Sequence, residues 1–197
     1  MTTAHKLRTL AAKHPAVRAG RYELGLYRDL IRWARGRTDV PEGAKPLPHP
    51  PGRLQMLGFL TAVLLIELVA VHLLLPSGTV QLIALLLSLW GIVFVWGLVA
   101  SERVRPSFID DRQLVLRRGR KVFAAVPLAL VSQWNANRSY ETDVTIDDGQ
   151  LTVGGSGGTD TQIVLLEPVH AAEDTYPWQK KRTASVTRVR FYSGGVL

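Results

Sequence analysis

The sequence predicts an α+β protein with three parts: an N-terminal amphipathic helical arm, a two-helix transmembrane hairpin and a C-terminal antiparallel β domain. Residues 54–100 contain one charged side chain, Glu67, while all 24 Lys and Arg residues lie outside this stretch. Before it the pattern is helical and rich in Arg, and after it apolar residues alternate as they do in strands. The chain therefore divides into residues 1–53, 54–100 and 101–197.

The apolar stretch predicts two membrane-spanning helices, at about 54–75 and 79–100. Each has about 20 residues, enough to cross a hydrocarbon core of about 30 Å. Pro76, Ser77 and Gly78 leave room only for a tight reversal, because Pro ends a helix and Gly accepts a positive φ. Apolar residues surround both helices and form no single stripe, so a buried hairpin of a soluble protein is the less favoured alternative.

The flanks predict the orientation of the hairpin. Arg53 precedes the first span, Arg103 and Arg105 follow the second, and the turn carries no charge. The positive-inside rule then places both termini in the cytoplasm, and residues 1–20 lack the apolar core of a signal peptide. Arg outnumbers Lys three to one, a bias typical of GC-rich bacterial genomes. We expect a multi-pass protein of a bacterial cell membrane.

Two polar residues, Glu67 and His72, fall inside the first span. An ionised carboxylate at such a depth costs about 2.5–3.5 kcal/mol to insert. The two residues are five apart and lie on different helix faces, so they form no metal site by themselves. One interpretation is a proton- or cation-responsive site or an inter-subunit hydrogen bond. The favoured interpretation is a neutral Glu67 bonded to Ser88 or Gln81, with His72 reaching the membrane interface.

Residues 22–35 predict an amphipathic helix that ends at Gly36. Leu26, Leu30 and Trp33 share one side, and another side carries three cations, Arg28, Arg32 and Arg35. Such a helix suits the membrane interface, with its arginines on anionic headgroups, and equally suits docking on the protein's own soluble domain. A weaker helical stretch at 3–13 would end at Pro15. The five prolines of residues 39–52 predict an extended spacer.

The C-terminal part predicts short strands bounded by Gly, Asp and Asn. They are Ser107–Asp110, Gln113–Arg117, Lys121–Val126, Val144–Ile146, Gln150–Val153, Gln162–Leu166 and Ser185–Tyr192. Residues 127–134 predict one helical turn or a short helix. A short motif, Ile-Asp-Asp-x-Gln-Leu, occurs at 109–114 and again at 146–151 and predicts two hairpin turns, in preference to a cation site. The glycine-rich residues 154–158 predict a flexible hairpin tip.

A basic hairpin lies close to the membrane exit. Its four cations are Arg117, Arg118, Arg120 and Lys121. Together with the arginines of the arm, they are our candidates for contact with anionic lipid or with a protein partner. The plainer alternative is a solvated hairpin tip without a ligand. No recognised nucleic-acid module accompanies these charges, so we expect no nucleic-acid partner.

The residue inventory argues against catalysis. The chain has no cysteine, which excludes disulfides, thiolate chemistry and zinc sites that need Cys ligands. The C-terminal part has His170 as its one imidazole, and the sequence lacks HExxH, GxSxG and P-loop motifs. We therefore expect no enzyme activity, no cofactor and no metal site.

Three segments, Val104–Asp111, Leu114–Gly119 and Val126–Leu128, carry a family resemblance. Together with the preceding hairpin they resemble bacterial PH-like domain membrane proteins, in which a hairpin is followed by a strand, a turn, an L-x-x-R-x-G hairpin and an I-P-L segment. The resemblance covers about residues 101–170 and implies a PH-like split barrel without catalytic residues. The chain departs from the family at Tyr192–Leu197, where a closing helix is usual. It also resembles small two-span membrane proteins of actinobacteria, a resemblance that supplies no activity.

These observations favour a non-catalytic membrane scaffold or accessory subunit that presents a cytoplasmic β domain to proteins or anionic lipids. The alternative is a homo-oligomeric transport or channel component that uses Glu67 within the membrane. Two spans enclose no pore alone, so this alternative requires self-assembly. The expected partners are membrane lipids with anionic headgroups, together with a protein partner or further copies of the chain.

Overall fold

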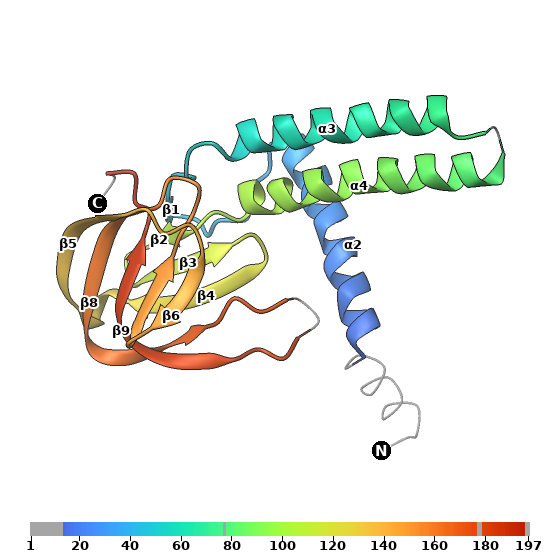
Figure 1. Ribbon diagram of the computed structural model, residues 1–197. Helices are drawn as coiled ribbons and strands as arrows, with labels where there is room; N and C mark the ends of the chain where they lie inside the picture. Colours follow the sequence, from blue (N-terminus) through green and yellow to red (C-terminus); the bar gives the residue numbers. More distant parts are fainter. Residues whose placement is uncertain (1–13, 77, 177–178, 196–197) are drawn as a thin grey trace, which may run out of the picture.

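The computed structural model describes residues 14–76, 78–176 and 179–195. The described chain is α+β, as predicted (Figure 1). Its helices are α2 (Pro15–Ala34), α3 (Arg53–Leu74) and α4 (Thr79–Val104). Helices α3 and α4 lie side by side as an antiparallel pair, and the strands form a separate body at the end of this hairpin that is opposite its turn. We call this end the open end of the hairpin.

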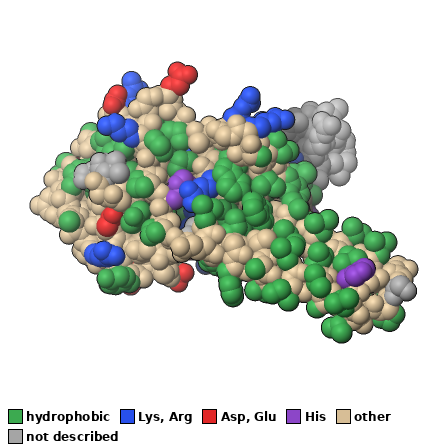
Figure 2. All heavy atoms as spheres, turned by 90° about the horizontal axis from the view of Figure 1, so that it is seen from above, with side chains coloured by type: hydrophobic (Ala, Val, Ile, Leu, Met, Phe, Trp, Pro, Cys, Tyr) green, Lys and Arg blue, Asp and Glu red, His purple; other side chains and the backbone are tan. Residues whose placement is uncertain are grey.

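Both hairpin helices are long and apolar enough to cross a membrane. Only 6% and 11% of the residues in their most apolar stretches are buried, so these helices do not form the core of a soluble domain. Figure 2 shows apolar side chains covering the hairpin, while the Lys, Arg, Asp and Glu side chains visible in that view lie over the rest of the molecule. Helix α4 continues one turn beyond the predicted end, to Val104, where Ser101 bonds Asp29 of the arm and lies beside Gly119 of the β domain, and where Val104 is fully buried.

Helix α2 crosses α4 near the open end of the hairpin (Figure 1). Leu26 is fully buried at this crossing, and Gly97 permits the approach, because an added Cβ there would lie 3.1 Å from the Leu26 Cβ. The Trp33 and Trp96 rings meet with their centroids 6.0 Å apart. The predicted amphipathic helix is thus confirmed, and its apolar side faces α4.

Helix α2 begins seven residues earlier than predicted. Pro15 begins this helix, because a missing N–H costs nothing in the first turn, and the His14 Nδ1 accepts a hydrogen bond from the Ala16 N–H at 3.3 Å. Pro15 is thus the first residue of α2, a role that the sequence reading did not assign to it. The helical stretch predicted at 3–13 lies outside the described residues. Gly36 follows the helix with a φ of 65°, as the prediction required.

The β domain consists of two sheets. A four-stranded sheet has the order β1-β2-β3-β4 and a five-stranded sheet the order β5-β8-β9-β7-β6. The strands are β1 (Lys45–Pro46), β2 (Phe108–Ile109), β3 (Gln113–Arg118), β4 (Lys121–Pro127), β5 (Val131–Ser139), β6 (Val144–Asp147), β7 (Gln150–Val153), β8 (Thr159–Ala172) and β9 (Thr183–Phe191). One apolar core joins the sheets, with Phe123, Ile163 and Phe191 among its largest buried side chains.

Three details of the β domain differ from the prediction. Strand β7 pairs with β9 in parallel, so the five-stranded sheet is mixed and not wholly antiparallel. Residues 127–134 contain one helical turn, the 3-10 turn Leu128–Leu130, which was one of the two predicted alternatives, but the last four residues of this segment already belong to β5. Strand β5 pairs along β8, which has 14 residues instead of the five predicted. This non-local pairing overrides the local helical pattern.

Both two-Asp motifs form hairpin turns, as predicted. The Asp110 Oδ1 accepts hydrogen bonds from the backbone N–H groups of Arg112 and Gln113 at 2.8 Å and 2.7 Å. These bonds lower the pKa of Asp110. Asp148 and Gly149 have positive φ values of 46° and 71° and connect β6 to β7. The first turn thus uses the Asp110 side chain for its local geometry, whereas the second reverses through the positive φ values of Asp148 and Gly149.

The proline-rich segment is not a free spacer, because it packs on the β domain. Lys45 and Pro46 form β1, whose partners in β2 are Ile109 and Phe108. The following Leu47 joins the apolar core of the domain. The next prolines lie against the glycine-rich loop, where an added Cβ on Gly155 would be 2.7 Å from the Pro50 ring. The chain on both sides of the hairpin thus builds one domain at the open end.

Candidate functional site: an arginine junction at the open end of the hairpin

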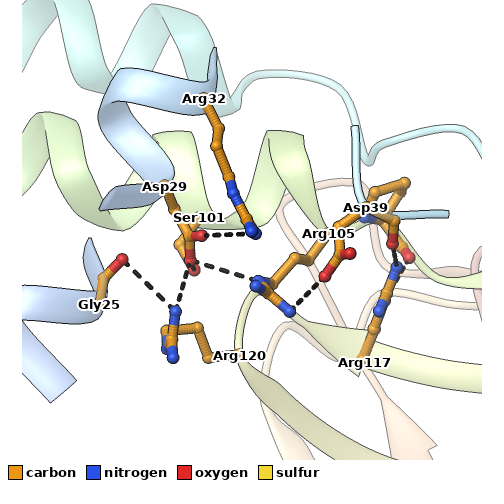
Figure 3. A network of polar contacts seen from close by, with 9 residues as sticks. Gly25, Asp29, Arg32, Asp39, Ser101, Arg105, Arg117 and Arg120 are labelled. Carbon is orange, nitrogen blue, oxygen red and sulfur yellow. Dashed lines mark hydrogen bonds and ion pairs between the residues drawn. The ribbon is translucent and has the colours of Figure 1, made fainter. Parts of the chain in front are cut away.

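A buried carboxylate, Asp29, lies where the arm, the hairpin and the β domain meet (Figure 3). The Asp29 Oδ2 accepts hydrogen bonds from Arg105 Nε at 3.3 Å and from Arg120 Nη1 at 3.1 Å. The Ser101 hydroxyl donates a third bond to the same oxygen at 3.3 Å. A carboxylate with no exposed surface needs such charged partners, because burial of an unpaired charge is strongly unfavourable.

The other oxygen of this carboxylate has a weaker partner. The Arg32 Nη1 lies 3.7 Å from the Asp29 Oδ1 as an ion pair within α2, and this buried oxygen makes no hydrogen bond among the described residues. Arg120 makes a second contact with the arm, donating to the Gly25 carbonyl at 3.4 Å. A Cβ on Gly25 would lie 2.5 Å from the Arg120 Cζ, so a larger residue at this position would displace the Arg120 guanidinium.

A second carboxylate, Asp39, extends the cluster to the chain after the arm. Arg105 bridges the two acids, because its Nη1 lies 2.5 Å from the Asp39 Oδ2 while its Nε contacts Asp29. The Asp39 N–H donates to the Val104 carbonyl at 2.7 Å, and Arg117 Nη2 donates to the Asp39 carbonyl at 2.5 Å (Figure 3). We call the six residues Asp29, Arg32, Asp39, Arg105, Arg117 and Arg120 the arginine junction.

The arginine junction holds four cations and two anions, so a positive charge of two remains uncompensated within it. Its members come from α2, the linker, the end of α4 and the β3–β4 hairpin. The ion pairs of Arg105 and Arg120 therefore join elements that are distant in the chain, whereas Arg32 pairs with Asp29 within α2. The arginine junction can hold the arm, the membrane hairpin helices and the β domain in fixed relative positions, and it concentrates positive charge. Its buried carboxylate has no exposed surface on which to act as a general base.

The predicted contact residues of the basic hairpin have partners within the chain. Arg117 also donates from Nε to the Pro106 carbonyl at 2.6 Å, and its guanidinium lies 4.9 Å from the centre of the Phe108 ring. Arg118 donates to the Gly154 carbonyl at 2.5 Å. Lys121 pairs with Asp174 and donates to the Thr175 carbonyl. The basic β3–β4 hairpin therefore packs against other parts of the chain and is not a solvated tip without contacts.

The arginines of the arm divide into two groups. Arg32 belongs to the arginine junction. Arg28 and Arg35 are exposed and make no hydrogen bond or ion pair within the described parts of the chain. These two side chains therefore remain available to a membrane surface or to a partner.

The polar residues of the first span lie apart from the arginine junction. Gln81 bonds His72, through both the His72 carbonyl at 2.8 Å and the ring Nδ1 at 3.3 Å. Ser88 is buried. Glu67 is exposed on the outer surface of α3 and makes no hydrogen bond or ion pair to any described residue. The predicted bond from Glu67 to Ser88 or Gln81 is therefore wrong, and Gln81 serves His72 instead.

The aromatic residues of α4 connect the hairpin to the arm. The Trp90 indole donates to the Glu23 Oε1 at 2.6 Å, and the Trp96 indole donates to the Thr61 hydroxyl on α3 at 3.0 Å. The hydrogen bonds that Tyr27 and Trp90 donate lower the pKa of Glu23. Burial raises the pKa of Tyr22, with the nearby Glu102 carboxylate acting in the same direction.

Sequence reasoning missed both acids of the arginine junction. Asp29 does have a readable signal: it is three residues after Leu26 and four before Trp33, so it occupies the apolar side of the amphipathic helix. An acid on such a face needs a buried cation as partner. Asp39 has no comparable signal, because its partners Arg105 and Arg117 are known only from the tertiary fold.

Within the described ranges, no group of three or more His, Asp or Glu side chains is placed to hold a metal ion. Comparison of the chain with protein-family models, with curated proteins and with solved structures found no match. The resemblance to PH-like membrane proteins therefore stays a prediction.

Proposed function

We propose that the protein is a non-catalytic membrane scaffold or accessory subunit. It holds a PH-like β domain against the cytoplasmic face of a bacterial cell membrane, where the domain binds protein partners or anionic lipid. Both termini are cytoplasmic in this proposal.

One observation supports this proposal above the others: the buried Asp29 carboxylate ties the arm to both the hairpin and the β domain. A catalytic or regulatory domain on a loose tether would need no such attachment. Here the β domain has a fixed position at the open end of two apolar helices. A fixed position and orientation are the properties that a scaffold needs.

The pairing of β1 with β2 supports the common location of the two flanks. Residues 45–46 precede the hairpin and residues 108–109 follow it, so both flanks lie at the open end. The open end carries Arg103, Arg105 and the arginines of the arm. By the positive-inside rule, this end is therefore assigned to the cytoplasm in our proposal.

The topology can be tested with single cysteines, because the native chain has none. Thr79→Cys lies beside the turn of the hairpin, and Gln133→Cys lies on the exposed surface of β5. In intact bacterial cells, a membrane-impermeant maleimide should label Thr79→Cys, and it should label Gln133→Cys only after the membrane is opened. The reverse pattern, or extraction of the chain without detergent, would overturn the membrane assignment.

The scaffold role is tested by extraction in mild detergent. We expect the full chain to co-purify with a stoichiometric protein partner, further copies of itself or bound anionic lipid. Recovery of a lipid-free, partner-free monomer would overturn it.

A second candidate function rests on Glu67. An exposed carboxylate two-thirds of the way along α3, without a partner in the described chain, favours a contact with another subunit, because hydrocarbon solvates a carboxylate poorly. This observation supports the alternative of a homo-oligomeric transport or channel component.

A further inference from the structure

A basic groove lies beside the arginine junction, between the start of α2, the end of α4 and the β3–β4 hairpin. Its volume is about 730 Å³. Six cations line it: Arg18, Arg21, Arg118, Arg120, Lys121 and Lys181. Two carboxylates, Glu102 and Asp174, are the acids of its lining, which leaves a net charge of +4. A concave site with this charge attracts anions more strongly than isolated surface arginines do.

The cations of the basic groove differ in how far they are already engaged. Arg120 and Lys121 are held by Asp29 and Asp174. Arg21 and Lys181 are exposed, and neither makes a hydrogen bond or ion pair with a described residue. These two side chains add charge without contributing contacts to the fold.

The apolar part of the lining indicates which kind of anion fits. Leu98 belongs to the second apolar helix, so one wall of the groove continues onto the membrane-spanning surface. Val122 and Tyr176, 47% and 64% exposed, add apolar and amphipathic surface on the side of the β domain. A water-soluble phosphate compound has no apolar part to bury against this surface, whereas a phospholipid presents a phosphate and an acyl chain together.

We infer that the basic groove binds the headgroup of an anionic glycerophospholipid, with its phosphate between Arg21 and Lys181 and its glycerol end towards Leu98. This inference rests on the proposed membrane function and names the lipid class that the site takes. The lipid neutralises part of the excess charge and fills the space between the arm and the β domain.

The test uses the full chain in nanodiscs of phosphatidylcholine containing a minor fraction of phosphatidylglycerol. After transfer to mild detergent, native mass spectrometry counts the retained lipids. We expect wild type to retain phosphatidylglycerol in preference to phosphatidylcholine. Each cation near an anionic lipid surface contributes about fivefold in affinity, so Arg21→Gln with Lys181→Gln should weaken retention by about 30-fold.

A matched control removes the same charge elsewhere. Arg112→Gln with Arg188→Gln changes two exposed residues that do not line the groove. This control should retain phosphatidylglycerol as wild type does. Equal losses in both double variants, or unchanged retention in the groove variant, would refute the site.

A further measurement distinguishes binding of a lipid from binding of a free anion. Inorganic phosphate in the detergent buffer should displace little of the retained phosphatidylglycerol, because it lacks the apolar part. Complete displacement by phosphate, or equal retention of phosphatidylcholine, would overturn the assignment to an anionic lipid. If the cysteine labelling still places both flanks in the cytoplasm, such a result refutes the lipid site alone and leaves the membrane scaffold standing.

Discussion

Replacement of Asp29 by Asn tests the arginine junction most directly. The substitution keeps the shape of the side chain and removes the charge that faces Arg105 and Arg120. Loss of one partner of a buried ion pair typically costs 3–5 kcal/mol. Arg105 keeps Asp39, and the Arg120 side chain is 34% exposed, so we take the lower end, about 3 kcal/mol. Because about 1.4 kcal/mol corresponds to a factor of ten, docking of the arm should weaken roughly 100-fold.

Amide hydrogen exchange in detergent micelles measures this change. Peptides that cover α2 should exchange up to roughly 100-fold faster in Asp29→Asn, because the arm undocks more often. The β-domain core should respond less, since its apolar cluster does not include the arm. A red shift of tryptophan emission should accompany the change as Trp33 separates from Trp96.

The control for this experiment is Asp147→Asn, which changes the same residue type at an exposed position on β6. It should leave exchange in α2 unchanged. If Asp29→Asn also leaves exchange in α2 unchanged, the ion pairs do not hold the arm, and the reasoning from burial and charge fails.

Three further predictions concern the hairpin and the linker. Gly97→Leu should destabilise the α2–α4 contact by about 1–3 kcal/mol through overpacking, seen as a lower melting temperature. Gly91→Leu, at a position with open space around it, should not. Burial lowers the pKa of His49, so the folded chain disfavours its protonated form. The contribution of neutral His49 to the free energy of unfolding should be fully present above about pH 6.5. It should be lost as the pH drops from there through the lowered pKa of His49. His49→Gln should flatten this fall in melting scans at pH 7 and pH 5.5. Glu67→Gln should leave the oligomeric state and the ion flux of reconstituted vesicles unchanged; loss of a defined oligomer would favour the transport alternative.

The hairpin and most strands were readable from the sequence because their signals are local. Two long stretches without Lys or Arg predict apolar helices within a few residues of α3 and α4. The two-Asp motifs predict turns because an Asp side chain bonds the next backbone groups, as Asp110 does. Such patterns need no knowledge of distant residues.

The missed features depend on pairings between distant segments. Strand β5 looks helical at its start, and only its pairing with β8 makes it a strand. Lys45 and Pro46 read as part of a spacer until β2 provides a partner. The basic residues looked like free contact sites, yet Arg117 and Arg120 are bound within the chain. Charge alone predicts where a cation lies along the sequence, and only the fold tells whether its partner is internal.

The short strand β1 has a consequence for how the protein is made. Its two residues leave the ribosome before either apolar helix, whereas their partners in β2 follow both. The four-stranded sheet cannot close until the second helix has brought the chain back to the open end of the hairpin, where β1 lies. A polypeptide halted after one helix keeps Leu47 without its core and Asp29 without Arg105 and Arg120. In the proposed membrane topology, closure of the β domain therefore follows insertion of the whole hairpin.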